Sequence, residues 1–330
     1  MPAISTLRNA SPYLTGWTRA YYQEKNFVAD KAMTPFNVPN EVDKYATINN
    51  DHYRYDATNT DMMLKSTDKS TSSEFDIGVS SATYNLQLYR EHHVVGRLEG
   101  DAASQKNIKL KETKTRGLKH HMSVYKETQF ASFLFGSTNY ASTNKAALSG
   151  SGIWSAAGNM GEAAFYSAYT PKYVVRSAID TVRKTSGGLI VNKMIVGAGV
   201  HKNLTSRADF LKFLATSSDV GYDRQNRFLA DLFGVDEYMP LLAVSNSAME
   251  GATDSMGDIG GAFVALIYQP NGAVDLDAPF GMNFNRETFP FVAEWVDDWR
   301  MGATVVENYE CYQFKSVSTV SGFLLTTVVS

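Results

Sequence analysis

One long segment, Asp101–Phe135, has the polar and apolar pattern of an amphipathic α-helix. Five side chains recur at steps of three and four and so share one side of this helix: Leu118, Met122, Tyr125, Gln129 and Phe133. Asp101 is suited to cap the first turn, and Gly136 is typical of a left-handed residue that ends a helix. The pattern therefore predicts one long helix, with Gly117 as a place where it bends.

The same helix carries a marked excess of positive charge. Between residues 106 and 126 the single acidic residue is Glu112, whereas the basic residues are Lys106, Lys109, Lys111, Lys114, Arg116, Lys119 and Lys126. Most charge runs are solvated faces of a helix. The alternative is a strut that meets acidic neighbours or a polyanion, and the pattern leaves both readings open.

Residues 42–97, which precede the helix, have the pattern of a long β-hairpin around a polar middle. The first strand is expected over Tyr45–Tyr55 and the return strand over Glu74–Val95. Neither flank has enough apolar side chains for the middle of a core, and a two-stranded hairpin is marginally stable alone in water. We therefore expect another polypeptide as its partner, including another copy of this chain.

Residues 1–41 have no apolar periodicity and are expected to form an extended arm. Prolines at positions 2, 12, 35 and 39 interrupt any long helix, although Gly16–Phe27 has room for a short one. Such an arm gains little by folding on itself, so we expect it to lie across another surface. A frayed terminus is the alternative.

The second half of the chain has the pattern of buried strands alternating with helices. The expected elements are a helix over Pro171–Lys184, a strand over Lys193–Val200, a helix over Asp223–Phe233, a strand over Tyr238–Val244, a loop over Ser245–Gly261, a central strand over Ala262–Tyr268, and terminal strands over Ala303–Phe314 and Phe323–Val329. Gly187 and Gly234 are expected to end the two helices, and Pro240 favours an edge position for its strand.

Composition narrows the function classes only slightly. The 330 residues are 44% hydrophobic and 20% charged, with a net charge of −3, so nothing draws the whole chain to nucleic acid. Cys311 is the only cysteine, which excludes an intrachain disulfide. No targeting segment is visible and no apolar run is long enough to cross a bilayer, so membrane roles are disfavoured.

No group of residues assembles into a catalytic, cofactor or metal motif. Gly197-Ala198-Gly199 follows a strand, but Lys202 stands where a dinucleotide-binding turn needs its third glycine, so a tight turn is favoured. The histidine pairs at 92–93 and 120–121 point to different faces, and no metal-ligand spacing occurs. We expect no enzyme, cofactor or metal. An enzyme with a dispersed active site and a surface adhesin remain the rivals from other classes.

The order of the expected parts resembles the major capsid proteins of tailed bacteriophages, which have the Hong Kong ninety-seven-type fold. That order is extended arm, long hairpin, long helix, α/β block and terminal strands. Short stretches are similar too: Met194–Leu204, Ala230–Val235, Ala262–Tyr268, Pro279–Phe284 and Val305–Glu310. The resemblance covers roughly residues 20–328 and rests on the ordered set.

This resemblance implies an α+β fold with five parts. They are an N-terminal arm (1–41), an extended hairpin loop (42–97), a peripheral domain with a long spine helix (98–164), an axial α/β domain (165–284), and peripheral-domain strands with the C-terminus (285–330). Val305–Glu310 is then the strand that runs beside the spine helix.

The function that the resemblance implies is self-assembly, as pentamers and hexamers, into an icosahedral shell around double-stranded DNA in a virion formed in the host cytoplasm. Implied partners are the chain itself, a portal protein, decoration proteins and packaged DNA without sequence specificity. Because no charged helical run precedes the arm, we also expect a separate scaffolding protein. The alternative is an encapsulin-like compartment that encloses a cargo enzyme.

Contacts between subunits are expected in the extended loop and on the spine helix. The residues that we assign to them are Tyr53, Arg54, Tyr55, Lys65, Lys69, Lys109, Lys111 and Lys114. For the cationic helix we favour an acidic patch of a neighbour over DNA. Some relatives join subunits through a Lys–Asn isopeptide bond, and here Lys65 or Lys69 with Asn308 is the candidate pair.

Overall fold

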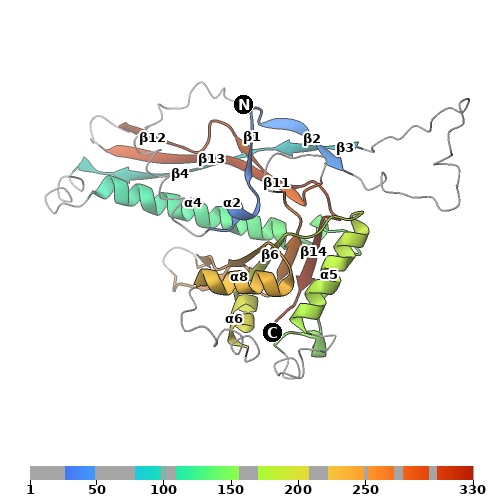
Figure 1. Ribbon diagram of the computed structural model, residues 1–330. Coiled ribbons are helices and arrows are strands. Elements are labelled where there is room, and N and C mark those ends of the chain that lie inside the picture. Colours follow the sequence, from blue (N-terminus) through green and yellow to red (C-terminus); the bar gives the residue numbers. More distant parts are fainter. Residues whose placement is uncertain are drawn as a thin grey trace, which may run out of the picture.

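The computed structural model describes residues 27–48, 79–97, 100, 109–155, 170–207, 222–248, 252–270, 278–296 and 303–329. Two five-stranded sheets form the body, and a long helix, α4 (Leu110–Leu134), lies along the first sheet and ends at the second (Figure 1). The expected α+β class is confirmed.

The first sheet is built around β13 (Thr304–Ser316), which pairs with strands on both sides. On one side β4 (Gln87–Val95) runs antiparallel to it. On the other side β12 (Phe291–Val296) pairs with its first half and β11 (Gly281–Arg286) with its second half. β13 is buried from Val305 to Tyr312, so both of its faces are covered. It is therefore the centre of this layer.

α4 differs from the expected helix in its buried face. Leu118 and Met122 are buried as expected, but Tyr125 is 45% exposed. Polar residues take the buried positions instead, and they are Thr115, Lys119, Ser123, Lys126 and Glu127. The predicted apolar stripe was wrong at Tyr125 because buried lysines and a glutamate do not register as core positions in a hydrophobicity pattern.

The ends of α4 also differ from the prediction. Gly136 has φ −69°, so it is not a left-handed residue, and a short 3₁₀ turn, Ser137–Asn139, follows it. α4 runs through Gly117 as one helix. The expected cap at Asp101 lies outside the described residues.

Where the sequence predicts one return strand of the hairpin, the structure has two strands, β3 (Val79–Asn85) and β4. β2 (Val42–Ile48) pairs antiparallel with β3, but β4 leaves this ribbon after the buried Leu86 and joins the first sheet. The prediction of one strand over Glu74–Val95 was wrong because β4 finds a second partner in β13. Residues 49–78, which connect β2 and β3, lie outside the described residues.

Part of the expected arm belongs to the body of the subunit. A single helical turn, α2 (Ala29–Ala32), has both of its alanines fully buried, and Met33 after it is buried too. β1 (Pro35–Val38) then pairs in parallel with β11. The boundary of a free arm at residue 41 was therefore wrong, since small side chains at 29 and 32 let this turn pack closely.

The second sheet has the strand order β5 (Lys145–Ala147), β14 (Gly322–Thr326), β10 (Val264–Ile267), β6 (Lys193–Gly197) and β7 (Glu237–Leu241). β10 is central and wholly buried, as predicted, and Pro240 lies on the edge strand β7. Helices α5 (Pro171–Thr185), α6 (Ala198–Ser206) and α8 (Tyr222–Phe233) pack against one face. The other face packs against the end of α4.

Two strands cross the domain boundaries expected from the sequence. β5 was placed with the peripheral part 98–164 and β14 with the part 285–330, but both pair in the second sheet. Phe323 and Leu325 of β14 join the apolar cluster under α5 and α8. A short 3₁₀ turn, Gly150–Gly152, follows β5.

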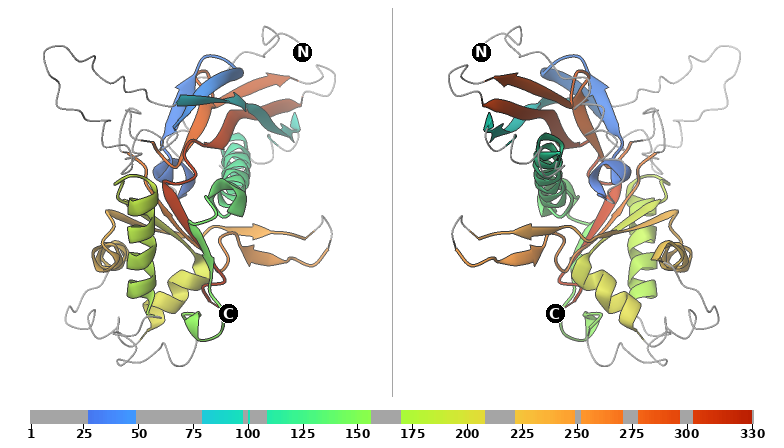
Figure 2. Two further views of the ribbon diagram at one scale, coloured as in Figure 1. Left: turned by 90° about the vertical axis from the view of Figure 1, so that its right-hand side faces the viewer. Right: turned by 90° about the vertical axis from the view of Figure 1, so that its left-hand side faces the viewer.

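The expected loop over Ser245–Gly261 contains a second projecting hairpin. β8 (Val244–Asn246) and β9 (Met256–Asp258) pair antiparallel and extend away from the body (Figure 2). Asn246 links the two strands at their ends, because its Oδ1 accepts hydrogen bonds from the amides of Ala248 and Ser255, each at 3.0 Å. Gly, Ser and Asp are typical of loops, which explains the wrong prediction.

Candidate assembly surfaces

Polar contacts with two elements, α4 and β11, fix the turn α2. The amide of Ala29 donates to Glu127 Oε1 at 2.8 Å. Asp30 Oδ1 lies 2.7 Å from Lys126 Nζ and accepts from Asn283 Nδ2 at 2.9 Å. Because these partners come from α4 and β11, the point at which the chain enters the body from residues 1–26 is set by the body itself.

Glu127 is the most unusual titratable group in this contact. Burial raises the pKa of Glu127 from 4.5 to about 7, and the charge of Asp30 acts in the same direction. Hydrogen bonds from the amides of Ala29 and Val28 and the charge of Lys126 partly oppose the rise. The carboxyl group that holds α2 therefore changes its charge near neutral pH.

A second polar contact joins α4 to the central strand of the first sheet. Lys119 Nζ pairs with Glu310, and the two side chains are 4% and 6% exposed. Lys126 also lies over the ring of Tyr312, with its Nζ 4.9 Å from the ring centroid. These contacts confirm that β13 runs beside the long helix. They also show that the cationic surface expected on α4 is, at Lys119 and Lys126, a buried surface that meets acidic residues of the same chain.

Two of the three lysines that were assigned to subunit contacts, Lys111 and Lys114, lie in the first two turns of α4. Lys111 pairs with Glu294 of β12, and Lys114 Nζ donates to the carbonyl of Val94 at 3.3 Å. Lys109 is exposed just before the helix. Lys111 and Lys114 thus have partners within their own chain, and a contact with a neighbouring subunit stays a prediction for all three.

The described base of the extended hairpin is joined to the first sheet by aromatic and polar contacts. Tyr84 stacks on Phe284 of β11 with ring centroids 4.7 Å apart. Tyr45 donates its hydroxyl to the carbonyl of Ser316 at 2.9 Å, and Arg286 pairs with Glu41. The base therefore has a fixed direction. The residues expected to contact a neighbour from this hairpin lie outside the described residues, and they are Tyr53, Arg54, Tyr55, Lys65 and Lys69.

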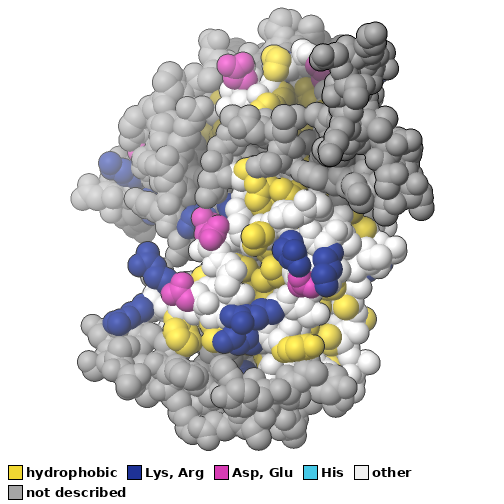
Figure 3. Space-filling model, turned by 45° about the vertical axis from the view of Figure 1, so that its right-hand side comes forward, with side chains coloured by type: hydrophobic (Ala, Val, Ile, Leu, Met, Phe, Trp, Pro, Cys, Tyr) yellow, Lys and Arg dark blue, Asp and Glu magenta, His cyan; other side chains and the backbone are white. Residues whose placement is uncertain are grey.

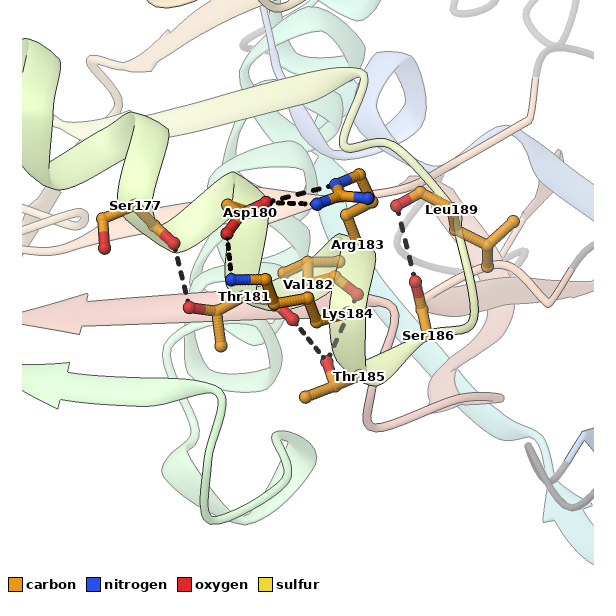
Figure 4. Close-up of polar contacts among 9 residues, drawn as sticks. All are labelled: Ser177, Asp180, Thr181, Val182, Arg183, Lys184, Thr185, Ser186 and Leu189. Carbon is orange, nitrogen blue, oxygen red and sulfur yellow. Dashed lines mark hydrogen bonds and ion pairs between the residues drawn. The ribbon is translucent and has the colours of Figure 1, made fainter. Parts of the chain in front are cut away.

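The outer surface of the second sheet is helical and basic along α5. Lys and Arg side chains gather on this side of the molecule, over the lower half of the view in Figure 3. Near the end of α5, Asp180 Oδ1 accepts from Arg183 Nη2 at 2.7 Å, and Lys184 pairs with the same carboxylate (Figure 4). Hydrogen bonds from these two cations lower the pKa of Asp180.

The described residues contain no arrangement suited to catalysis by a metal ion. In that part of the chain, no group of three or more His, Cys, Asp or Glu side chains lies close enough to hold one. A shallow cavity of about 240 Å³ between α4 and β4 contains an exposed pair, His121 and Glu91, with Nδ1 and Oε2 2.8 Å apart. No described helix has the length and apolar character needed to cross a bilayer.

Gly197, the last residue of β6, has a packing role. A Cβ atom on Gly197 would lie 2.1 Å from the carbonyl oxygen of Gly261 and 2.2 Å from that of Gly260. Gly197 is therefore required by the close approach of residues 260–261. This agrees with the tight turn that the sequence favours over a phosphate-binding turn.

The position of Asn308 counts against the expected isopeptide bond. Asn308 is 1% exposed and its Nδ2 lies 3.2 Å from Met122 Sδ, so α4 covers it. A lysine from another copy cannot reach this amide in the arrangement described. Lys65 and Lys69 keep their predicted place in subunit contacts, but their pairing with Asn308 does not fit.

Comparison with solved structures defines the class of the fold. No protein-family model and no curated protein matches the chain. The chain is similar to a phage-related protein from Bordetella bronchiseptica RB50, with 18% identity, 98% of each chain covered and a TM-score of 0.69. It is also similar to the mature capsid of bacteriophage PhiM1, with 10% identity, 90% of this chain and 86% of that chain covered, and a TM-score of 0.53.

A third similar structure is a virus-like particle from Pyrococcus furiosus. The identity is 10%, the coverage is 95% of this chain and 97% of that chain, and the TM-score is 0.54. What these proteins share with this chain at such low identity is the fold. The chain has the Hong Kong ninety-seven-type fold that is also seen in phage capsid structures such as that of PhiM1.

Proposed function

We propose that this chain is a structural protein, not an enzyme, and that it assembles as pentamers and hexamers into an icosahedral capsid around double-stranded DNA. One observation carries the proposal. The body holds the root of the arm, which is α2, through the contacts of Glu127 and Asp30. It also holds the base of the extended hairpin, which is β2 and β3, through Tyr84 and Tyr45. Segments anchored in fixed directions are suited to reach the same place on every neighbour.

The polarity of these anchors supports a role in assembly. Buried polar networks add little stability over apolar packing, but they specify one arrangement of the groups that they join. At α2 the network joins residues far apart in the sequence, such as Asp30 and Asn283. A closed shell needs this uniformity, because each subunit repeats the same contacts.

The proposal includes partners beyond the chain itself. We expect a scaffolding protein to guide assembly, a portal protein to occupy one vertex, and decoration proteins to bind the outside of the shell. The virion is the expected location, after assembly in the host cytoplasm. We keep Lys109, Lys111 and Lys114 as a contact with an acidic patch of a neighbour, so changing all three to Gln should reduce assembly before it reduces DNA content.

The test is expression of the full chain with and without its genomic neighbours, followed by negative-stain microscopy and analysis of particle contents. We expect closed shells that contain long double-stranded DNA when the neighbours are present. Shells that contain one type of enzyme would overturn the capsid reading in favour of an encapsulin-like compartment. A monomer or small dimer under every condition would overturn assembly altogether.

A further inference from the structure

The exposed side of α5 combines an aromatic ring with a cationic row. Tyr173 is 58% exposed, and Arg176 follows it on the same side of the helix at a spacing of three. Over its whole length α5 carries four basic residues, Lys172, Arg176, Arg183 and Lys184, and one acid, Asp180. The helix therefore has a net charge of +3.

The β8–β9 hairpin has the complementary character. Its register pairs Val244 with Asp258 and Asn246 with Met256, so these four side chains share one face. Met256 is 65% exposed and Val244 is also exposed. Between residues 242 and 259 the sequence has three acids, at 250, 254 and 258, and no Lys or Arg, which gives a net charge of −3.

The hairpin and α5 lie on opposite sides of the second sheet. α5 packs on the face that also carries α8. The hairpin extends away from the other side, as both views in Figure 2 show. A single copy therefore cannot bring the two surfaces together. Two copies placed head to tail can, and such a contact closes into a ring when it repeats with a fixed rotation.

We propose that the β8–β9 hairpin of one copy lies along α5 of the next copy within a ring of subunits. Met256 and Val244 cover the ring of Tyr173, and Asp258 pairs with Arg176. This inference rests on the proposed function, because it needs a ring. It goes beyond that function in naming the two surfaces that meet and in assigning a role to a hairpin that the sequence presents as a loop.

The chemistry of the two faces favours this pairing over a partner of another kind. Met makes favourable contacts with aromatic rings, and Tyr is well suited to an interface with one wet edge. Equal and opposite charge also steers copies into one orientation and disfavours hairpin against hairpin. A hairpin without its own core gains stability once its apolar face is covered.

The first experiment is disulfide trapping in the full chain, with Met256→Cys and Tyr173→Cys combined. The native thiol is a poor competitor, because Cys311 is 4% exposed and burial raises its pKa to about 11. We expect a ladder of cross-linked species, up to rings, on a non-reducing denaturing gel of assembled particles. The matched control combines Met256→Cys with Lys44→Cys, an exposed position on β2, and should stay monomeric.

The second experiment exchanges the charges. Asp258→Arg and Arg176→Asp, each alone, should lower the assembled fraction at least about tenfold, because like charges then face each other at every contact of the ring. The two changes together should restore assembly to within about twofold of the native level. Sedimentation velocity measures the assembled fraction, and circular dichroism of each variant checks that it folds.

The outcomes separate this inference from the proposed function. Native shells that form while the Met256–Tyr173 pair gives no more cross-link than the control would overturn the inference alone. If every variant folds but the double charge variant does not recover assembly, this inference is also overturned. That result would point to a different occupant of α5. Failure of the native chain to assemble under any condition would overturn both.

Discussion

The two sheets of this protein are stabilised in different ways. The second sheet is mainly apolar on both faces, with buried Lys193 at the start of β6 as an exception, and its central strand β10 buries Val264, Ala265, Leu266 and Ile267 completely. The first sheet meets α4 through buried charges instead, chiefly Lys119 with Glu310. The comparison indicates that apolar packing stabilises the second sheet. In the first sheet, polar pairs instead fix the positions of the helix, the arm and the hairpin.

The largest effect that would test this contrast is expected for Lys119→Met. The change leaves Glu310 buried without its cation, which typically costs about 3–5 kcal/mol of unfolding free energy. Urea unfolding of the unassembled chain measures the loss. The double variant Lys119→Met with Glu310→Leu is the control, since replacing both partners with apolar side chains should recover most of it. A single variant as stable as the native chain would show that this ion pair is not what orders the contact.

A core truncation in the second sheet should have a slightly smaller effect. Leu266→Ala removes a fully buried side chain from the cluster under α5 and α8, and the expected loss is about 3 kcal/mol. The same urea titration measures it. Here no second substitution on a partner should rescue stability, because many neighbours share the contact. Rescue by one compensating change would make the two sheets alike and remove the contrast.

Glu127→Gln should change how stability depends on pH. The folded-state pKa of Glu127 is raised from 4.5 to about 7, so between these values the folded chain keeps a proton that the unfolded chain releases. The native chain therefore loses stability as pH rises through this window. The Gln variant lacks this loss, and its advantage over the native chain should grow by about 2 to 3 kcal/mol across the window, at roughly 1.4 kcal/mol per pH unit.

Thermal or urea unfolding of both chains at closely spaced pH values measures the Glu127 effect. The groups that face Glu127, Asp30 and Lys126, are the same in both chains, so they cancel in the difference. A difference that stays constant with pH would mean that Glu127 keeps an ordinary pKa and that its burial does not control the root of the arm.

The smallest effect is expected for the half-exposed pair on the same helix. Lys111 and Glu294 are 39% and 31% exposed, so water screens their attraction. Lys111→Gln should change unfolding free energy by less than about 1 kcal/mol. Both Lys111 and Lys119 pair with a glutamate of the first sheet, but only the Lys119 pair is buried. Comparing this variant with Lys119→Met therefore shows whether burial or charge causes the loss of unfolding free energy. Equal losses in the two variants would show that burial does not distinguish them.

Much of the fold could be predicted from local patterns. The helix now called α5 was expected over Pro171–Lys184 and runs to Thr185, and Gly187, with φ 74°, ends it as expected. Gly234 likewise ends α8 with φ 74°. These features depend on neighbours within a few residues, which is the range that periodicity and capping report.

The candidate surfaces were only partly predictable. The lysine-rich helix was recognised, but its acidic partners within the chain, Glu310, Asp30 and Glu294, were missed. One signal was available, since Glu307 and Glu310 interrupt an otherwise strand-like run over Ala303–Phe314. A charged residue in a strand that is covered on both faces needs a partner of opposite charge. The lysines of the long helix were the candidates for that partner.

The sequence by itself determined the order and type of the main elements, because helix and strand periods, turn glycines and prolines act locally. The tertiary structure alone decided which sheet receives β4, β5 and β14, how much of the arm joins the body, and which charges are buried. These features depend on contacts between distant residues, such as the 191 positions that separate Lys119 from Glu310. No local pattern records a partner so far along the chain.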